Sequence, residues 1–86
     1  MPGLEKRFAA AQAEAKRLPS RPDDDSLLEL YSYFKQATEG DVKGDKPGFT
    51  DFVNRAKYEA WAKLKGMPAD EAMKAYVKLV ERVTRE

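Results

Sequence analysis

Two side chains that could hold an anion lie four residues apart near the middle of the chain: Tyr31 and Lys35. In a helix, residues at this spacing lie one above the other on the same face, so a hydroxyl donor and an ammonium group would point the same way. Such a pair is suited to bind an anion. The simpler alternative is that Lys35 lays its methylene groups on the core and keeps its ammonium in water, as lysines at the edge of an apolar face usually do.

A second lysine makes the anion interpretation more specific. Lys57 shares a helical stripe with Trp61, so it also lies on an aromatic face. Lys35 is the only cation in residues 23–38, and its place near the negative end of a helix is worth only about 0.3 to 1 kcal/mol, which does not explain the matching Lys57. A ligand with phosphates and a flat aromatic ring would explain both lysines, because ammonium groups neutralise phosphate and apolar surface receives the ring.

The composition excludes several classes of protein. The 86 residues include no cysteine and no histidine, so disulfides, thiolate metal sites and a hydrolytic triad cannot form. Sixteen basic and fifteen acidic residues give a net charge of +1, far from the basic excess that nucleic-acid binding favours. We therefore expect no nucleic-acid partner.

The length predicts one domain, residues 1–86, and the N-terminal sequence predicts a cytoplasmic protein, which we expect to be a monomer. Glu5, Lys6 and Arg7 interrupt any apolar run long enough for a signal peptide or a membrane span. A chain this small buries only about 60 to 65% of its unfolded surface, so we expect modest stability and no large enclosed cavity. The run Asp23–Asp25 resembles a helix cap more than a calcium loop, and we predict no metal and no cofactor.

The periodicity predicts four amphipathic helices and therefore an all-α four-helix bundle. The first should end near Leu18, before two prolines, and the second should begin at the aspartates. Asp51 should cap the third helix and Gly66 should close it, and Pro68 should open the fourth. The predicted inward residues of the fourth helix are Ala69, Met73, Tyr76, Val80 and Val83.

A long loop separates the second and third helices. Periodicity is lost from Glu39 to about Thr50, where glycine and proline recur. Connections between neighbouring bundle helices usually take about 2 to 8 residues, so this longer one should cross the bundle and make the two helices parallel. Its repeated Gly-Asp pairs could suggest a phosphate cradle, but four carboxylates against two lysines would repel phosphate.

Two runs in the chain carry a resemblance to a known family. YSYFKQATEGDVKGDKPG, residues 31–48, and KYEAWAKLKGMPADEAMKAYV, residues 57–77, stand in the order and at the distance of the signature of the acyl-CoA-binding protein family. The resemblance extends from about Phe8 to Val83. It implies a bundle of that family's type and a non-catalytic role in binding, buffering and intracellular transport of long-chain fatty acyl-CoA esters.

The resemblance also implies a set of site residues. Tyr31, Lys35 and Lys57 match the residues that hold the 3′-phosphate and adenine end of the ligand, and Tyr76 and Lys16 match further contacts. The complete predicted set of ligand-binding residues is Lys16, Leu28, Tyr31, Ser32, Tyr33, Phe34, Lys35, Lys57 and Tyr76. The implied partners are long-chain acyl-CoA, the enzymes that use it and transient contact with membranes.

Two positions depart from the family pattern, and two other functions stay open. Val53 stands where many relatives have a lysine, and Tyr58 replaces a tryptophan. From the residues alone, Tyr76 and Trp61 are expected core residues, and for Trp61 this expectation is kept. The alternatives are a helical adaptor that grips an acidic peptide or partner helix, and an enzyme with Lys35 or Lys57 as an amine nucleophile of strongly lowered pKa.

Overall fold

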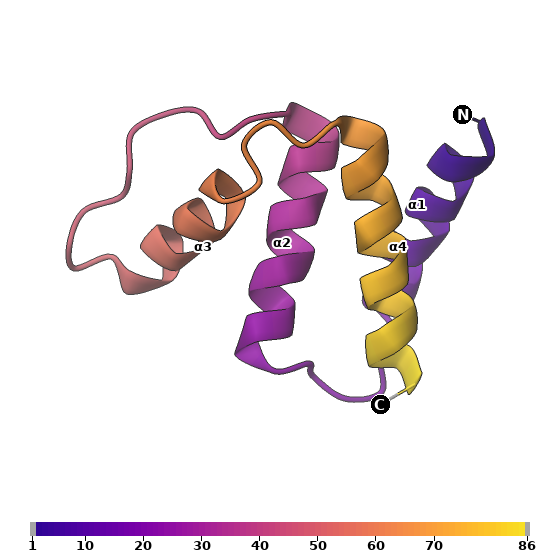
Figure 1. Cartoon of the computed structure of the whole chain (residues 1–86). Helices are drawn as coiled ribbons and strands as arrows, with labels where there is room; N and C mark the ends of the chain where they lie inside the picture. The colour runs from indigo at the N-terminus through magenta and orange to yellow at the C-terminus, as the bar shows by residue number, and fades with distance from the viewer. Residues whose placement is uncertain (1, 86) are drawn as a thin grey trace.

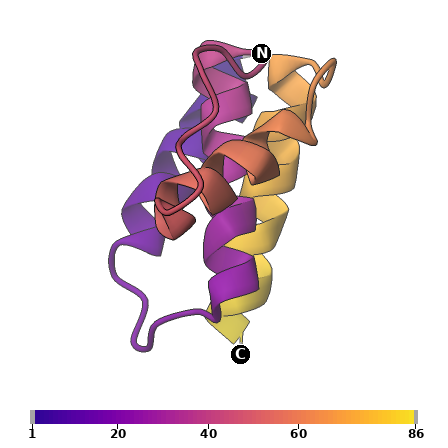
Figure 2. The same cartoon turned by 90° about the vertical axis from the view of Figure 1, so that its left-hand side faces the viewer.

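The structure, a computed structural model, describes residues 2–85, which form four helices and no strand (Figure 1). The helices are α1 (Pro2–Ala15), α2 (Asp24–Glu39), α3 (Phe52–Ala62) and α4 (Ala69–Arg85). α1 and α4 run in one direction, and α2 and α3 run in the other (Figure 1). The predicted all-α fold of four helices is therefore confirmed. α3 runs in the same general direction as α2, as predicted, but lies obliquely across it instead of parallel to it (Figure 2).

α2 and α4 are the central pair of the bundle. α1 packs on α4, and α3 packs on α2; within residues 2–85 no other two helices come as close. Figure 2 shows α3 lying in front of α2, with the loop from residue 40 to residue 51 outside it. α3 therefore has a single helical neighbour, and only the loop covers part of its other faces.

The core lies where α1, α2 and α4 meet. Phe8 packs edge-on against Tyr76 with 5.1 Å between ring centroids, and Phe34 stacks on Phe8 at 6.2 Å. The prediction for α4 was right for Tyr76 and Val80, which are buried, and for Met73 and Val83, which pack against the cluster. Ala69 was a wrong prediction, because it is the exposed first residue of α4. The buried cluster consists of Phe8, Ala11, Leu30, Ala37, Ala72, Tyr76, Val77, Leu79 and Val80.

Two helices end earlier than predicted. α1 ends at Ala15 rather than near Leu18, because the Arg17 amide donates to the Glu14 carbonyl three residues back and tightens the chain into a turn. Pro19 also disfavours the helical conformation at the residue before it. α3 ends at Ala62, and Gly66 lies beyond it in a turn with φ of +90°.

The predicted aspartate caps have the right positions but not the expected bonds. Asp23 and Asp51 are the N-cap residues of α2 and α3, yet neither side chain accepts a hydrogen bond from the amides of its helix. The Asp51 carboxylate accepts instead from the Asn54 side chain at 3.1 Å. Both carboxylates place favourable charge at the positive helix end, and hydrogen bonding with the Ser26 side chain lowers the pKa of Asp23.

A buried glutamine ties together the two connections at one end of the bundle. Gln36 is 1% exposed, and its amide nitrogen donates to Asp41 Oδ1 and to the Met67 carbonyl, each at 2.9 Å. The same Asp41 oxygen accepts from the Gly66 amide at 2.7 Å, and this bond, with that from Gln36, lowers the pKa of Asp41. The loop after α2 and the turn before α4 are thereby fixed to each other.

The rest of the loop 40–51 is fastened to α3 by polar contacts. The Tyr58 hydroxyl donates to the Gly44 carbonyl at 3.1 Å, and Lys46 pairs with Glu59 at 2.9 Å. Tyr58, one of the two departures from the family pattern, thus helps to hold the loop. α3 and its loop form one unit that rests on α2.

Candidate functional site

The predicted anion-binding groups gather around the ring of Tyr31. The Lys57 ammonium lies 5.3 Å from the ring centroid, and the Lys35 ammonium lies 6.0 Å from it. Tyr31 and Lys35 come from α2, whereas Lys57 comes from α3. The packing of α3 on α2 therefore brings together three residues that the spacing had placed on two separate faces.

Contacts with Glu39 and Trp61 favour the charged form of Lys35 and fix the position of its ammonium group. Lys35 forms an ion pair with Glu39 one turn further along α2, and its ammonium lies 5.1 Å from the Trp61 ring centroid. The hydrogen bond to Glu39 raises the pKa of Lys35 and lowers that of the Glu39 carboxyl. An anion arriving at Lys35 must therefore share the ammonium with Glu39 or displace it.

An apolar groove of about 470 Å³ runs between α2 and α3, beside these lysines. We call it the α2–α3 groove. Its charged residues are Lys57 and the exposed pair Arg21 and Asp24, which are 3.2 Å apart. The lining residues are Arg21, Asp24, Leu27, Leu28, Tyr31, Phe52, Val53, Ala56 and Lys57. The groove could receive an apolar chain whose polar end lies at the lysines.

A smaller pocket of about 260 Å³ opens on the other side of Tyr31. We call it the tyrosine pocket, because Tyr31 and Tyr76 both line it. Tyr31 and Leu27 line both cavities and so form the wall between them. Burial raises the pKa of Tyr76, so its phenol stays neutral and able to donate a hydrogen bond. The lining residues are Ala15, Leu18, Pro22, Leu27, Leu30, Tyr31, Phe34 and Tyr76.

Most of the predicted site residues line one of these cavities or contact Tyr31. Leu28 lies in the α2–α3 groove, Phe34 and Tyr76 in the tyrosine pocket, and Tyr31 in both. Lys16 is exposed in the turn after α1 and follows Ala15, a residue of the tyrosine pocket. Contact of Lys16 with a ligand stays a prediction.

Ser32 and Tyr33 lie outside both cavities. Ser32 is 4% exposed and its hydroxyl donates to the Glu29 carbonyl at 2.9 Å, so its proton is already engaged. Tyr33 packs against the core cluster. Both stand inside the matching run of sequence, but the turn of the helix directs them away from Tyr31. Direct contact of either residue with a ligand stays a prediction.

Sequence reasoning missed several residues of this site. Glu39 was counted only as a loop carboxylate, although the four-residue spacing from Lys35 was a readable signal for an ion pair. Phe52 was not among the candidate residues, yet it lines the α2–α3 groove and is 74% exposed. Trp61 is buried as expected, but its indole nitrogen donates to the Gly40 carbonyl at 2.8 Å instead of joining the core cluster.

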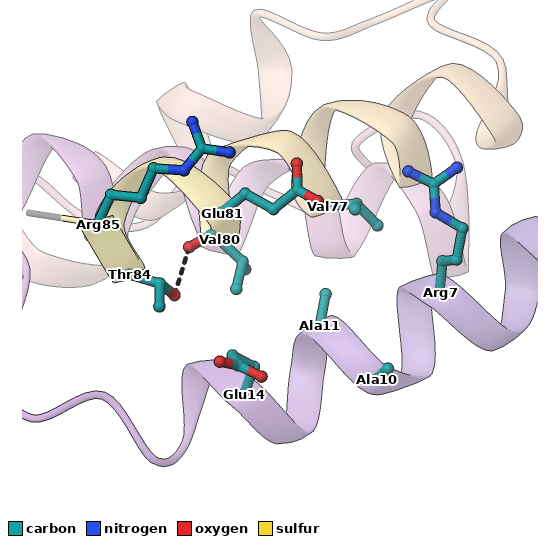
Figure 3. Close-up of a pocket in the computed structure, with 9 residues that line it drawn as sticks. All are labelled: Arg7, Ala10, Ala11, Glu14, Val77, Val80, Glu81, Thr84 and Arg85. Atoms are coloured by element: carbon teal, nitrogen blue, oxygen red, sulfur yellow. Dashed lines mark hydrogen bonds between the residues drawn. The ribbon is translucent and has the colours of Figure 1, made fainter.

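A third cleft, of about 380 Å³, lies between α1 and α4 (Figure 3). Arg7 and Arg85 stand at its two ends, and alanine and valine side chains form its floor (Figure 3). Thr84 uses its hydroxyl to donate to the Val80 carbonyl at 2.7 Å. The cleft contains no aromatic ring and none of the predicted site residues, so it lacks the means to bind a planar ring.

Residues 2–85 were searched for clusters of metal ligands and for helices of membrane-spanning length. This part of the chain contains no group of three or more carboxylates placed to hold a metal ion. None of its helices is both long enough and apolar enough to cross a membrane.

Comparison with known proteins gives matches over almost the whole chain. The sequence pattern of a family described as "Acyl CoA binding protein" matches residues 5–80. Acyl-CoA-binding protein homolog 1 of Caenorhabditis elegans is 49% identical over 76 residues, which cover 88% of this chain and 88% of that protein. The acyl-CoA-binding protein homolog of Drosophila melanogaster is 44% identical over 78 residues, or 91% of each chain.

The fold has equally close matches among solved structures. The crystal structure of acyl-CoA-binding protein 2 from Oryza sativa aligns with a TM-score of 0.92 and 34% identity, covering 96% of this chain and 90% of that one. The identity is high enough, and the coverage broad enough, for the likeness to extend beyond the arrangement of helices.

Proposed function

The chain belongs to the acyl-CoA-binding protein family, and we propose that it binds long-chain fatty acyl-CoA esters and carries them without catalysis. One observation carries the proposal: the ring of Tyr31 lies beside the ammonium groups of Lys35 and Lys57 and also lines the apolar α2–α3 groove. A CoA thioester needs this combination, because its phosphates are anionic and its acyl tail must leave water. The likeness to proteins named for acyl-CoA binding supports the same function.

The two ends of the ligand suit different parts of the site. We assign the 3′-phosphate and adenine to Tyr31, Lys35 and Lys57, and the beginning of the acyl chain to the α2–α3 groove. Tyr76 can donate its hydroxyl from the tyrosine pocket, and Lys16 can add charge from the turn after α1. Leu28 and Phe34 supply apolar contact, one in each cavity.

A carrier role agrees better with the chemistry of Lys35 than an enzymatic one does. A lysine that acts as a nucleophile needs a lowered pKa in a dry pocket. The hydrogen bond that the Lys35 ammonium donates to the Glu39 carboxylate raises the pKa of Lys35 instead. No observation favours the alternative of an adaptor for an acidic peptide.

We further propose that residues 1–86 act as one acyl-CoA-binding domain, monomeric and cytosolic, with no resident cofactor. In this role the protein would keep the thioester and its tail out of water between the membranes and enzymes that exchange them. Charged residues of both signs make up 36% of the chain, which suits a protein that must stay in solution.

The proposal is tested by titration calorimetry with palmitoyl-CoA and with free CoA. Each buried methylene contributes up to about 0.8 kcal/mol, so two or three buried carbons should make palmitoyl-CoA bind at least about tenfold more tightly. Equal dissociation constants would show that the groove does not take the tail. Absence of heat with both ligands would reject the function itself.

A further inference from the structure

Glu39, the last residue of α2, carries a carboxylate from which the helix gains little. The C-terminal end of a helix is its negative end, so an acid there is unfavourable. Pairing with Lys35 offsets this only in part, because a pair with the acid on the C-terminal side has the weaker orientation. The loop that follows is held by bonds from Gln36 to Asp41 and Met67, without Glu39. Stability therefore gives little reason for a carboxylate at position 39.

The Glu39 carboxylate engages an ammonium group that we assign to the ligand. Among residues 2–85, Lys35 is its only hydrogen-bond and ion-pair partner. The two side chains are 23% and 41% exposed, so the pair is open to the solvent from which a ligand arrives. A carboxylate and a phosphate are both anionic acceptors for the same ammonium. Glu39 is therefore a resident anion at one of the groups assigned to the 3′-phosphate.

The pair also holds the Lys35 ammonium nearer to Trp61 than to the centre of the site. The distance to the ring centroid is 5.1 Å for Trp61 and 6.0 Å for Tyr31. Lys57, by contrast, lies 5.3 Å from the Tyr31 ring centroid. Trp61 lines neither the α2–α3 groove nor the tyrosine pocket. We therefore expect Lys35 to loosen its contact with Glu39 when it acts together with Lys57 on one phosphate.

We propose that Glu39 is a specificity-determining residue that competes with the 3′-phosphate of the ligand for Lys35. A ligand with this phosphate displaces the carboxylate, whereas a ligand without it leaves the pair intact. The hydrogen bond from Lys35 chiefly, and the charges of Lys35 and Lys43, lower the pKa of Glu39, so a carboxylate released from Lys35 still has a cation nearby. The inference rests on the proposed acyl-CoA binding and concerns the selectivity of that same site.

The test compares the parent with Glu39→Gln by titration calorimetry with palmitoyl-CoA and with its 3′-dephospho form. Glutamine keeps the size of the side chain and removes the charge. Because the pair is partly exposed, Glu39→Gln should tighten palmitoyl-CoA binding by only about two- to fivefold. The dephospho ligand should bind parent and variant almost equally. Removing Glu39 should thus increase the preference for the phosphorylated ligand by the same factor.

Glu59→Gln is the matched control. Glu59 forms a comparable ion pair with Lys46 at 2.9 Å, with side chains 43% and 49% exposed. Neither residue lines the α2–α3 groove or the tyrosine pocket. The substitution makes the same change in net charge, so it should leave the affinity for both ligands unchanged. Equal tightening in Glu39→Gln and Glu59→Gln would show an effect of net charge and overturn the proposal.

A double variant separates competition for Lys35 from simple repulsion of the ligand. In a protein that already carries Lys35→Ala, the contested ammonium is absent, so adding Glu39→Gln should give no further gain. A gain of the same size as in the parent would show that Glu39 acts on the ligand directly.

Other outcomes would also overturn the proposal. Weaker palmitoyl-CoA binding by Glu39→Gln would show that the carboxylate positions Lys35 for the ligand. Equal tightening for both ligands would place the competition at another phosphate, and unchanged affinity would show that none takes place. These results all require a parent that binds palmitoyl-CoA. A parent that gives no heat with it would instead reject the proposed function, so the two failures are distinguishable.

Discussion

The two sides of α2 use aromatic rings in different ways. Toward α1 and α4, Phe34 stacks on Phe8, and both rings face Tyr76, so ring packs on ring. Toward α3, Tyr31 and Trp61 lie beneath the ammonium group of Lys35. The first arrangement removes apolar surface from water and stabilises the fold. The second keeps charge next to rings at the surface, where a ligand can use both.

The contrast extends to α3 as a whole. α3 packs on one helix only, and Trp61 is its one residue that is fully buried within the described chain. The apolar residues at its start remain largely exposed. Apolar side chains on the α4 side therefore serve stability, whereas those on the α3 side are open to a ligand or partner.

The largest effect we predict is on the free energy of unfolding. It comes from replacing a phenylalanine by alanine on the two sides of α2, once in the core and once at the start of α3. Phe8 is 6% exposed and Phe52 is 74% exposed. Phe8→Ala should lower the free energy of unfolding by about 3 to 5 kcal/mol, because it opens a cavity between three helices. Phe52→Ala should change it by less than about 0.5 kcal/mol. Urea denaturation followed by circular dichroism measures both, and a comparable loss in the two variants would show that α3 belongs to the core.

The next effect is on ligand affinity and concerns the lysines around Tyr31. A hydrogen bond to a charged group is worth about 1.5 to 3 kcal/mol, so Lys35→Ala and Lys57→Ala should each weaken acyl-CoA binding about ten- to a hundredfold. Neither should greatly alter stability, since both lysines lie outside the core cluster. Lys78→Ala, an exposed position on α4, is the matched control.

A ligand without the 3′-phosphate shows what these lysines bind. If they hold that phosphate, dephospho acyl-CoA should bind the parent and both variants almost equally, because the partner group is already absent. Equal losses of affinity for the two ligands would place the lysines elsewhere, for example on the pyrophosphate. The comparison needs only calorimetry on three proteins and two ligands.

The sequence contained enough to predict the bundle and the centre of its site. Periodicity placed Tyr31 and Lys35 on one face of α2, and the family resemblance grouped Lys57 with them; the packing of α3 on α2 brings the Lys57 ammonium to 5.3 Å from the Tyr31 ring. Local spacing suffices when both residues lie on one helix, or when a chain constraint fixes the direction of the next helix.

What the sequence could not predict depends on long-range contacts. Gln36 is a polar residue on a helix that carries both polar and apolar residues, so its local sequence does not indicate that it is buried. Its burial depends on hydrogen bonds to Asp41 and to Met67, which is 31 residues away. Phe52 and Val53 follow a helical stripe, but periodicity does not reveal whether a neighbour covers that stripe. Because α3 has one neighbour only, these residues line an open groove instead of a core.

The smallest effect we predict comes from the position where a family lysine is missing. Val53 is 67% exposed and lines the α2–α3 groove, so a lysine there would reach a bound polyanion without being desolvated. At Val80, which is 2% exposed, the same charge would lie buried and unpaired. Val53→Lys should therefore leave stability nearly unchanged and tighten acyl-CoA binding about two- to fivefold at low ionic strength, the range expected of an exposed ion pair.

Two comparisons distinguish an effect of charge at position 53 from an effect of side-chain size: a change of ionic strength and an uncharged variant. The gain in Val53→Lys should shrink as ionic strength rises, because the Debye length falls to about 10 Å at 0.1 M salt. Val53→Met lengthens the side chain without charge and should show no such dependence on salt. If Val53→Lys binds like the parent at both ionic strengths, position 53 does not face the anionic part of the ligand. The groove beside it would then hold only the tail, and the polar end would be confined to the lysines around Tyr31.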